Sequence, residues 1–338
     1  MSYKHIIATR KGGPEVLETR TAGLQEPGPG QALVRIQRAG VAFGDLLWIS
    51  GRVPGGPRHP FIPGYDFVGV IERLGAGQTD LEPGQAVAGL VKTGGYSEYA
   101  SVPFEYLAPV PEGVVASEAV CATLNYLTAV QIFQRTAGLK PGQRVLVHGA
   151  SGGVGTAMLQ VGRLLDLEMY GTASQAKQDL VASLGATPID YKNEDFVERI
   201  ASLTGDGVDL VVDHVGGNHL KRSFQTLRPG GLLVSSSAYG SVRGDAGFLE
   251  NILGFIRLPL WSLWPNGKKA ILLDVVPYYH KNPAELAEDF PIVLSYLAEG
   301  RIQPVIDCQL PLVEARTALE LLLHGKASGK IVLVCNDG

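Results

Sequence analysis

A group of small residues follows an apolar run in the segment RVLVHGASGGVGTAM, residues 144–158. Its spacing, A-x-G-x-x-G, is a variant of the loop that joins a strand to a helix in dinucleotide-binding sheets. Small residues let a pyrophosphate approach the backbone, and the start of a helix offers unpaired N–H groups and a positive dipole end. A tight packing turn is the alternative. We predict that six consecutive residues bind the pyrophosphate: Ala150, Ser151, Gly152, Gly153, Val154 and Gly155.

The end of the next predicted strand bears on which dinucleotide would bind. NAD-specific enzymes place an acid there against the ribose 2′-hydroxyl. This chain instead has GTAS, ending at Ser174, followed by Lys177. A hydroxyl and a cation suit a 2′-phosphate, so we expect NADPH rather than NADH. We predict that Ser174, Lys177 and Tyr191 flank that phosphate; a solvated lysine and a rim tyrosine are the alternatives.

The elements that must position this loop are visible as alternating patterns. From about residue 120 onward, apolar runs typical of strands alternate with helix-like segments, which indicates a parallel sheet wrapped by helices. Before residue 120, glycine and proline interrupt short alternating runs, which predicts irregular antiparallel β structure. After about Asn282, a helix, a strand, a helix and the strand GKIVLVC follow, and this tail can complete the first domain.

Composition limits the class of protein. A chain of 338 residues exceeds the usual single core, so we expect two domains. Hydrophobic residues make up 45%, charged residues 18%, and the net charge is -4, which gives no electrostatic reason to expect a nucleic-acid partner. Three scattered cysteines suit reduced thiols, and neither a secretory signal nor a membrane span is recognisable. We expect a cytoplasmic protein.

Three segments carry a family resemblance: IPGYDFVGVIERLGAG, LKPGQRVLVHGASGGVG and SGKIVLV. Together they resemble the medium-chain dehydrogenase/reductase superfamily, in its zinc-free quinone oxidoreductase branch, over nearly the whole chain. The resemblance implies an α/β protein in which a GroES-like, β-rich catalytic domain (1–121, completed by 277–338) accompanies a Rossmann domain with a doubly wound parallel sheet (122–276). It also implies a homodimer formed through the Rossmann sheet edge at KKAILLDVV. Lys330 resembles a returning-loop residue beside the nicotinamide, so we expect it at the cofactor and assign it no catalytic role.

Zinc-dependent members of the superfamily polarise the substrate oxygen with a metal. The resemblance places two of their catalytic ligands at Ala42 and Tyr65, which replace the cysteine and the histidine. Cys121 lies near the third ligand position, but a single thiol does not make a zinc site. We therefore predict that the chain binds no metal.

Without a metal, an activated acceptor is easier to reduce than an alcohol is to oxidise. We predict an NADPH-dependent oxidoreductase that transfers hydride to a quinone or an α,β-unsaturated carbonyl, with Tyr65, Asn125 and Thr128 as the catalytic candidates. A tyrosine that fills the vacated metal pocket, and helix packing for Asn125 and Thr128, are the alternatives. Two other functions remain open: an alcohol dehydrogenase with an unrecognised metal site, and a non-catalytic NADPH-binding scaffold or vesicle-associated protein.

The pocket expected for quinone reductases of this branch is altered. Ala42, Leu47 and Val53 stand where the resemblance implies an asparagine and two tyrosines, which favours a roomier, apolar pocket. The aromatic segment 248–264 is our candidate for a specificity cap. His148 is expected to pack inside a strand and Asp213 to close one, and no Ser-His-Asp arrangement follows from the spacing.

Overall fold

The structure is a computed structural model that describes residues 2–52, 55–236, 258–263 and 265–336. The chain divides into two compact units: unit 1 comprises Met1–Leu127 and Val276–Gly338, and unit 2 comprises Thr128–Val275. The first boundary follows Leu127, whereas the expected one followed residue 121, so residues 122–127 belong to unit 1.

Unit 2 contains a six-stranded parallel sheet with the strand order β10-β9-β8-β11-β12-β13. The order reverses direction at β8, as it does in dinucleotide-binding sheets. The predicted fold class is therefore confirmed. The strands are β8 (Arg144–His148), β9 (Glu168–Ala173), β10 (Thr187–Asp190), β11 (Val208–Asp213), β12 (Leu227–Ser235) and β13 (Lys269–Leu272).

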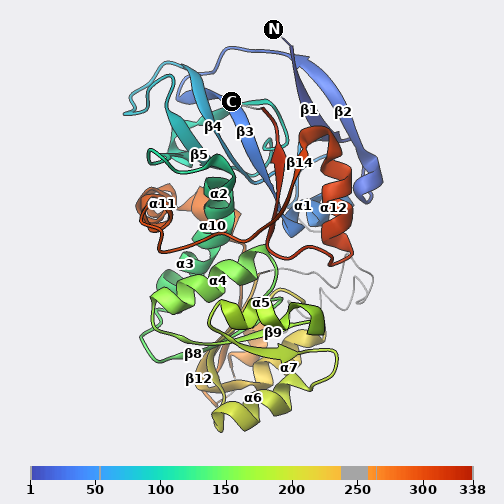
Figure 1. The fold of residues 1–338 in the computed structure, drawn as a ribbon, viewed down its shortest axis with the longest axis vertical. Helices are drawn as coiled ribbons and strands as arrows, with labels where there is room; N and C mark the ends of the chain where they lie inside the picture. Colours follow the sequence, from blue (N-terminus) through green and yellow to red (C-terminus); the bar gives the residue numbers. More distant parts are fainter. Residues whose placement is uncertain (1, 53–54, 237–257, 264, 337–338) are drawn as a thin grey trace. The chain divides into compact units, whose positions relative to one another are not determined.

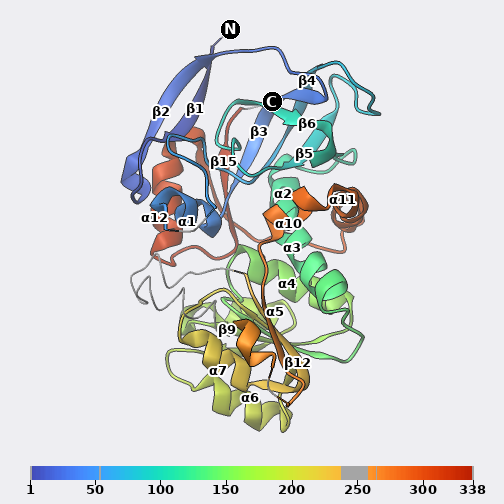
Figure 2. The same ribbon diagram turned by 180° about the vertical axis from the view of Figure 1, so that it is seen from behind.

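Helices cover both faces of this sheet, which is drawn green to orange in Figure 1. Figures 1 and 2 show α4 and α5 on one face and α6 and α7 on the other. Because both faces are covered, every residue of β11 is buried, including the acids Asp209 and Asp213. The helices are α4 (Gly153–Leu164), α5 (Gln178–Ser183), α6 (Phe196–Thr204) and α7 (His219–Gln225).

The α6 and α7 face holds a hydrophobic cluster that includes Leu146, Val211, Leu233 and Leu258. Trp261 packs on Phe224, with ring centroids 5.3 Å apart. Leu258 and Trp261 come from the aromatic segment 248–264, of which residues 248–257 and 264 lie outside the described residues. The described part of that segment therefore contributes to the core of unit 2, and its expected role as a cap stays a prediction.

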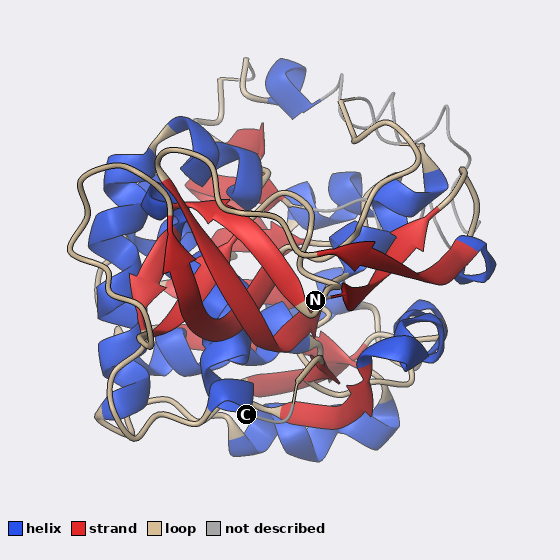
Figure 3. Cartoon of the chain, turned by 90° about the horizontal axis from the view of Figure 1, so that it is seen from above, coloured by secondary structure: helices blue, strands red, loops and turns tan. Residues whose placement is uncertain are grey.

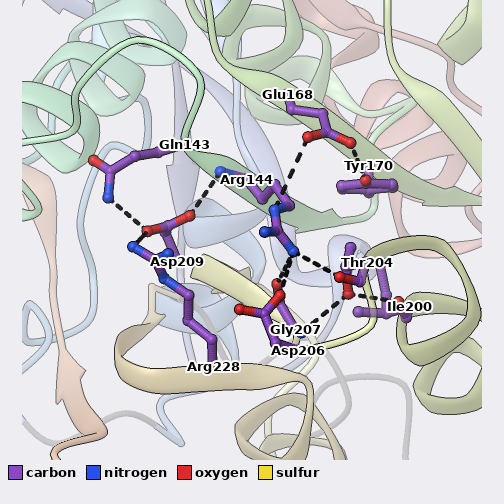
Figure 4. A network of polar contacts seen from close by, with 10 residues as sticks. All are labelled: Gln143, Arg144, Glu168, Tyr170, Ile200, Thr204, Asp206, Gly207, Asp209 and Arg228. Carbon is purple, nitrogen blue, oxygen red and sulfur yellow. Dashed lines mark hydrogen bonds and ion pairs between the residues drawn. The ribbon is translucent and has the colours of Figure 1, made fainter.

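A polar network ties together the amino ends of β8 and β11, as Figure 4 shows. Asp209 accepts hydrogen bonds from Gln143 Nε2 (2.5 Å) and the Arg144 main-chain N–H (2.8 Å), and it pairs with Arg228. Arg144 in turn donates to the carbonyl oxygen of Gly207 (2.9 Å). The glycine-rich loop follows the carboxyl end of β8, so this network stabilises the opposite end of the sheet.

The edge strand β13 has a hydrogen-bonding partner on its outer side. Ala270 N–H donates to Ser262 Oγ (3.0 Å), and Ser262 Oγ donates to the Ala270 carbonyl (3.4 Å). Leu260, Leu263 and Leu272 around this edge are exposed by 53%, 78% and 55%, which leaves an apolar surface beside it. The expected final strand of the Rossmann sheet is thus present, with a serine hydroxyl bound to its main chain.

Unit 1 is built around a seven-stranded sheet with the path β14-β15-β3-β4-β5-β7, in which β6 also pairs with β3, and a separate β1–β2 hairpin. Figure 3 shows these strands in red, strongly twisted. The strands are β1 (Ser2–Ala8), β2 (Leu17–Gly23), β3 (Gln31–Val41), β4 (Asp66–Leu74), β5 (Ala86–Leu90), β6 (Tyr99–Pro103), β7 (Leu107–Pro109), β14 (Ile306–Pro311) and β15 (Lys330–Val334).

The last strand, β15, pairs antiparallel with β3 and parallel with β14, so the C-terminal tail completes the sheet that the N-terminal segment begins. The helix that follows β7 continues through two π-helical stretches. The remaining helices are α1 (Phe43–Ser50), α2 (Ala116–Cys121) with the π-stretch Ala122–Tyr126, α3 (Leu127–Val130) with the π-stretch Gln131–Thr136, α10 (Val275–Lys281), α11 (Pro283–Ala298) and α12 (Ala315–Leu323). From Thr128 onward, α3 and its π-stretch belong to unit 2, and α10 begins at Val275, the last residue of unit 2.

Among the described residues, no helix combines the length and the apolar character that crossing a lipid bilayer requires.

Candidate functional site

The glycine-rich loop connects β8 to α4 through a backbone that depends on glycine. Gly149 has φ +72°, in the left-handed region that glycine adopts readily. A Cβ at Gly155 would lie 2.3 Å from the Gly149 carbonyl oxygen, so α4 can approach the loop only without a side chain there. Ala150 is fully buried against β9, where a Cβ at Gly171 would lie 2.6 Å from the Cβ of Ala150. These small residues bring the start of α4 against the strand ends.

Two glycines of the loop face open space instead. A Cβ at Gly149 would meet nothing within 4 Å, and one at Gly152 would meet only the Gly149 carbonyl oxygen, at 3.4 Å. Gly152 is the N-cap of α4 and has no side chain to cap it. The first-turn amides of a helix have no intrahelical acceptors, so the start of α4 presents N–H donors beside this open space. The residues present therefore fit a phosphate group.

The structure brings two of the three predicted 2′-phosphate residues to neighbouring strand ends. Ala173 of β9 and Asp190 of β10 are register partners, and Ser174 and Tyr191 directly follow them. Tyr191 is 52% exposed. Lys177 lies one short turn after Ser174, to whose carbonyl its main-chain N–H donates (2.8 Å). Ser174 and Tyr191 thus lie just beyond the carboxyl ends of two neighbouring strands, and Lys177 lies in the turn that follows Ser174.

The carboxylate of Asp190 is engaged within its own loop. It accepts hydrogen bonds from the Lys192 main-chain N–H (3.1 Å) and from Asn193 Nδ2 (2.7 Å). No acid occupies the position after β9 where a ribose 2′-hydroxyl would be bound. The groups at this edge are a hydroxyl, an ammonium and a phenol.

Behind the loop, polar side chains form a buried network that sequence reasoning missed. Ser223 Oγ donates to Asp213 Oδ2 (2.6 Å) and lies 3.1 Å from His148 Nε2. His219 Nδ1 lies 2.8 Å from the same Asp213 oxygen, and His148 Nδ1 lies 3.1 Å from Thr172 Oγ1. Thr172 Oγ1 also accepts from the Gly149 main-chain N–H (3.3 Å). The network therefore reaches the first glycine of the loop.

The electrostatics of this network follow from burial and hydrogen bonding. Burial, assisted by the neighbouring His219, lowers the pKa of His148 to about 3, so its imidazole is neutral at neutral pH. Burial opposes ionisation of Asp213, but the hydrogen bond and charge of His219 and the Ser223 hydroxyl lower its pKa below the usual range. A buried carboxylate thus lies beside two imidazoles. His148 does more than pack, because both of its ring nitrogens make hydrogen bonds.

Within unit 1, Lys330 lies in a buried ion pair. Its Nζ is 2.8 Å from Asp66 Oδ2, and the two side chains are 2% and 0% exposed. Gly40 makes room for the pair, since a Cβ there would lie 2.4 Å from both Asp66 Oδ2 and Lys330 Cε. The ammonium group expected at the cofactor therefore already has a charge partner inside unit 1.

Tyr65, which replaces the family's metal-binding histidine, is 6% exposed. Its ring lies on Trp48, with centroids 4.9 Å apart, and over Gly44, where a Cβ would be 2.8 Å from the Tyr65 hydroxyl oxygen. This geometry favours the alternative of a tyrosine that fills the vacated metal pocket.

Asp45 anchors the backbone around Tyr65. Its carboxylate accepts hydrogen bonds from the main-chain N–H groups of Ala42 (2.9 Å) and Gly64 (2.9 Å) and from the Tyr96 hydroxyl (2.8 Å). Burial nevertheless raises the pKa of Asp45 to about 6. The acid thus joins the start of α1 to the segment that precedes Tyr65, which is a structural role.

Asn125 and Thr128 are 3% and 5% exposed. Asn125 lies in the π-helical stretch Ala122–Tyr126, a geometry often found at functional sites. In the part of the chain that the structure describes, no hydrogen-bond partner is found for the Asn125 side chain, although a buried amide usually has one. Thr128 does have a partner. Asn125 is thus the catalytic candidate whose side chain has no hydrogen-bond partner among the described residues.

The third metal position of the family holds Cys121, whose thiol is buried. Burial raises the pKa of the Cys121 thiol to about 12, and the thiol donates to the Ser117 carbonyl (3.1 Å). Together with Ala42 and Tyr65, it leaves unit 1 without the family's zinc ligand set.

Two units of this kind, one with a GroES-like sheet and the other with a dinucleotide-binding sheet and its glycine-rich loop, define a two-domain oxidoreductase fold. Family models match over both: an alcohol dehydrogenase GroES-like domain over residues 28–112 and a zinc-binding dehydrogenase domain over residues 184–333. The chain belongs to the medium-chain dehydrogenase/reductase superfamily and is similar to quinone oxidoreductases.

The individual relatives differ in the functions that their names give. The synaptic vesicle membrane protein VAT-1 homolog of Rattus norvegicus is 31% identical over 97% of this chain and 83% of its own length. The 2-haloacrylate reductase of Burkholderia sp is 30% identical over 97% of this chain and 98% of its own. The crystal structure of Escherichia coli quinone oxidoreductase complexed with NADPH has a TM-score of 0.88 and 27% identity, and covers 98% of this chain and 99% of that one.

Proposed function

We propose that the chain is an NADPH-dependent reductase of quinones or α,β-unsaturated carbonyl compounds. The observation that carries the proposal is the open space at Gly149 and Gly152 beside the uncapped first turn of α4. The loop Ala150 to Gly155 binds the pyrophosphate there. The NADPH complex of the Escherichia coli relative and the 2-haloacrylate reductase support this assignment.

Ser174, Lys177 and Tyr191 select the phosphorylated dinucleotide. Lys177 is the residue whose charge distinguishes a 2′-phosphate from a 2′-hydroxyl, because the dianion gains most from a nearby cation. The carboxylate of Asp190 does not oppose this, since its hydrogen bonds hold it within its own loop.

NADPH, when bound, supplies the hydride and the reducing equivalents. The residues of this chain orient the acceptor. They also donate hydrogen bonds to the carbonyl oxygen of the acceptor as negative charge develops on that oxygen. Asn125 is our candidate donor, because its amide has no partner in the described residues. Thr128 assists in binding, and Tyr65 shapes the pocket with its buried ring. The family's zinc ligand positions are Ala42 and Tyr65, so we assign no metal to this step.

The test is an acceptor panel of quinones and enones followed by NADPH absorbance, with NADH in parallel. Lys177→Ala should weaken NADPH binding at least tenfold and leave NADH binding unchanged. The matched control is Lys140→Ala, which removes an exposed lysine before the amino end of β8 and should alter neither. Unchanged NADPH affinity in Lys177→Ala would show the phosphate assignment to be wrong.

The VAT-1 homologues favour a second candidate, an NADPH-binding protein of vesicle membranes that has little or no turnover. Tight NADPH binding without NADPH oxidation by any acceptor of the panel would support it. A single quinone or enone with saturable, NADPH-dependent turnover would favour the reductase.

We also propose that the chain forms a homodimer through the β13 edge, supported by the exposed Leu260, Leu263 and Leu272 beside it. The Ser262 hydroxyl binds both main-chain groups of Ala270. Its side chain must therefore move aside if the β13 strands of two copies are to pair through their main chains.

A further inference from the structure

Three potential metal ligands meet at the carboxyl ends of β8 and β11. His148 ends β8, Asp213 ends β11, and His219 begins α7. The two strands are neighbours in the sheet, and their ligand atoms and that of His219 all lie within 4.8 Å of one another. No other group of this kind is found in the described residues. All three belong to unit 2, whereas the zinc positions of the family lie in unit 1.

The charge at this point is incompletely balanced. Asp213 is 0% exposed, and a buried carboxylate is stable only when it is paired, hydrogen-bonded or bound to a metal. In the described part of the chain, neither a lysine nor an arginine forms an ion pair with it, and the His219 imidazole lies 2.8 Å from its Oδ2. A divalent cation would add a positive charge directly beside this buried carboxylate.

The outer contacts hold the ligands in place. Asp213 Oδ1 accepts from the main-chain N–H groups of Val215 (2.7 Å) and Gly216 (3.0 Å), which leaves Oδ2 facing the imidazoles. His148 Nδ1 faces Thr172 Oγ1 at 3.1 Å, so its Nε2 faces inward. Contacts of this kind orient metal ligands and fix the tautomer of a ligating histidine.

Ser223 offers a fourth donor atom. Its Oγ lies 2.6 Å from Asp213 Oδ2, 3.1 Å from His148 Nε2 and 3.3 Å from His219 Nδ1. Ligands about 2.1 Å from a tetrahedral zinc ion lie about 3.4 Å apart, so small outward movements would suit the ion. The His219 side chain is 22% exposed, which gives the otherwise buried group a route to solvent.

We propose that His148, Asp213 and His219 bind one zinc ion, with the Ser223 hydroxyl or a water molecule as the fourth ligand. Two imidazoles and one carboxylate suit zinc better than magnesium or calcium, which prefer oxygen ligands. The ion replaces the hydrogen bonds among these side chains, with the imidazole protons on the outward nitrogens. It joins β8, β11 and α7, and its role is structural.

The test uses the full chain, stripped with a chelator and titrated with Zn²⁺ and separately with Co²⁺. We expect one equivalent to bind, a Co²⁺ absorption spectrum of tetrahedral type without sulfur charge transfer, and a higher unfolding temperature with Zn²⁺. His219→Ala should lower the Zn²⁺ affinity at least tenfold. The matched control, His324→Ala, removes an exposed histidine outside the cluster and should leave the affinity unchanged.

Equal affinities of the wild type and His219→Ala would overturn the proposal, as would a sulfur charge-transfer band or less than one equivalent bound. Circular dichroism checks that each variant folds, and His219→Gln replaces the alanine variant if it does not. X-ray absorption spectroscopy of the wild-type protein with bound zinc identifies the ligand atoms without any variant. We expect two imidazole ligands together with oxygen ligands, and a sulfur ligand would contradict the assignment.

Discussion

At the residue scale, the glycines of the loop differ in what a side chain would meet. Gly155 is required by the protein itself, because a side chain there would overlap the loop backbone. Gly152 is not required in this way, and a Cβ there would have nearly ordinary contacts. Under the proposed function, we expect Gly155 to be needed for folding and Gly152 for binding of the dinucleotide.

Gly155→Ala should destabilise unit 2 by about 1–3 kcal/mol, the usual range for overpacking. Gly152→Ala should leave the unfolding temperature nearly unchanged and weaken NADPH binding at least tenfold. Thermal unfolding and a fluorescence titration with NADPH measure the two effects. Similar losses of stability in both variants would show that Gly152 is also a packing glycine.

The acid at residue 45 gives a pH-dependent prediction. Burial raises the pKa of Asp45 from 3.8 to about 6, so between these values the folded state holds a proton that the unfolded state releases. The stability contributed by Asp45 is therefore complete at low pH and is lost as pH rises through about 6. A shift of this size corresponds to about 3 kcal/mol.

Asp45→Asn removes this titration. The free energy of unfolding of the wild type minus that of Asp45→Asn should fall by up to about 3 kcal/mol as the pH rises from 3.8 to above 6. Denaturant unfolding at several pH values measures it. A difference that stays constant or rises with pH would contradict the raised pKa.

At the scale of elements, the two ends of the unit 2 sheet are specialised. The carboxyl ends of β8 and β9 lead to the small, open loop and to the proposed phosphate residues. The amino ends of β8 and β11 are joined by charged side chains around Asp209 (Figure 4). Stability and binding can therefore be changed independently at opposite ends of the same strands.

Asp209→Asn tests this separation. The variant loses the charge that pairs with Arg228 and weakens the hydrogen bonds from Gln143 and Arg144. We expect a loss of about 2 kcal/mol in the free energy of unfolding, within the range for hydrogen bonds to charged groups. NADPH affinity should be unchanged. A parallel loss of affinity would show that the amino ends also control the loop.

Patterns along the chain were sufficient to predict the sheet of unit 2 but not the contacts across it. Apolar runs that alternate with helix-like segments mark β8 to β12, because both faces of a parallel sheet are buried. Ser223 and His219 carry no such signal. They meet His148 and Asp213 only because α7 folds back over the strand ends, and hydrogen bonds of that kind depend on tertiary placement.

At the scale of the whole molecule, the two chain ends form one unit. β15 completes the sheet begun by β3, and Lys330 brings its charge to Asp66 from 264 positions away. Sequence reasoning recognised the returning strand from its resemblance to the family and expected Lys330 at the cofactor. It had no means of predicting the ion pair, because local sequence does not reveal a partner so distant.

Lys330→Met distinguishes the two roles of this lysine. It leaves Asp66 buried without its cation, so we expect a loss of about 3–5 kcal/mol in stability. Lys330→Met combined with Asp66→Asn should recover part of that loss. If the lysine serves only the ion pair, the double variant binds NADPH with wild-type affinity. Restored folding with weakened NADPH binding would instead support the expected cofactor contact.

The hydroxyl of Ser262 has a consequence for the solubility of the folded chain. An edge strand with free main-chain groups is a template on which other chains can add strands and aggregate. Because Ser262 binds both the N–H and the carbonyl of Ala270, at the middle of a short strand, an incoming strand must displace it first. The Ser262 side chain thus disfavours the addition of strands from other chains to β13. Because the side chain can move, the edge is not blocked permanently.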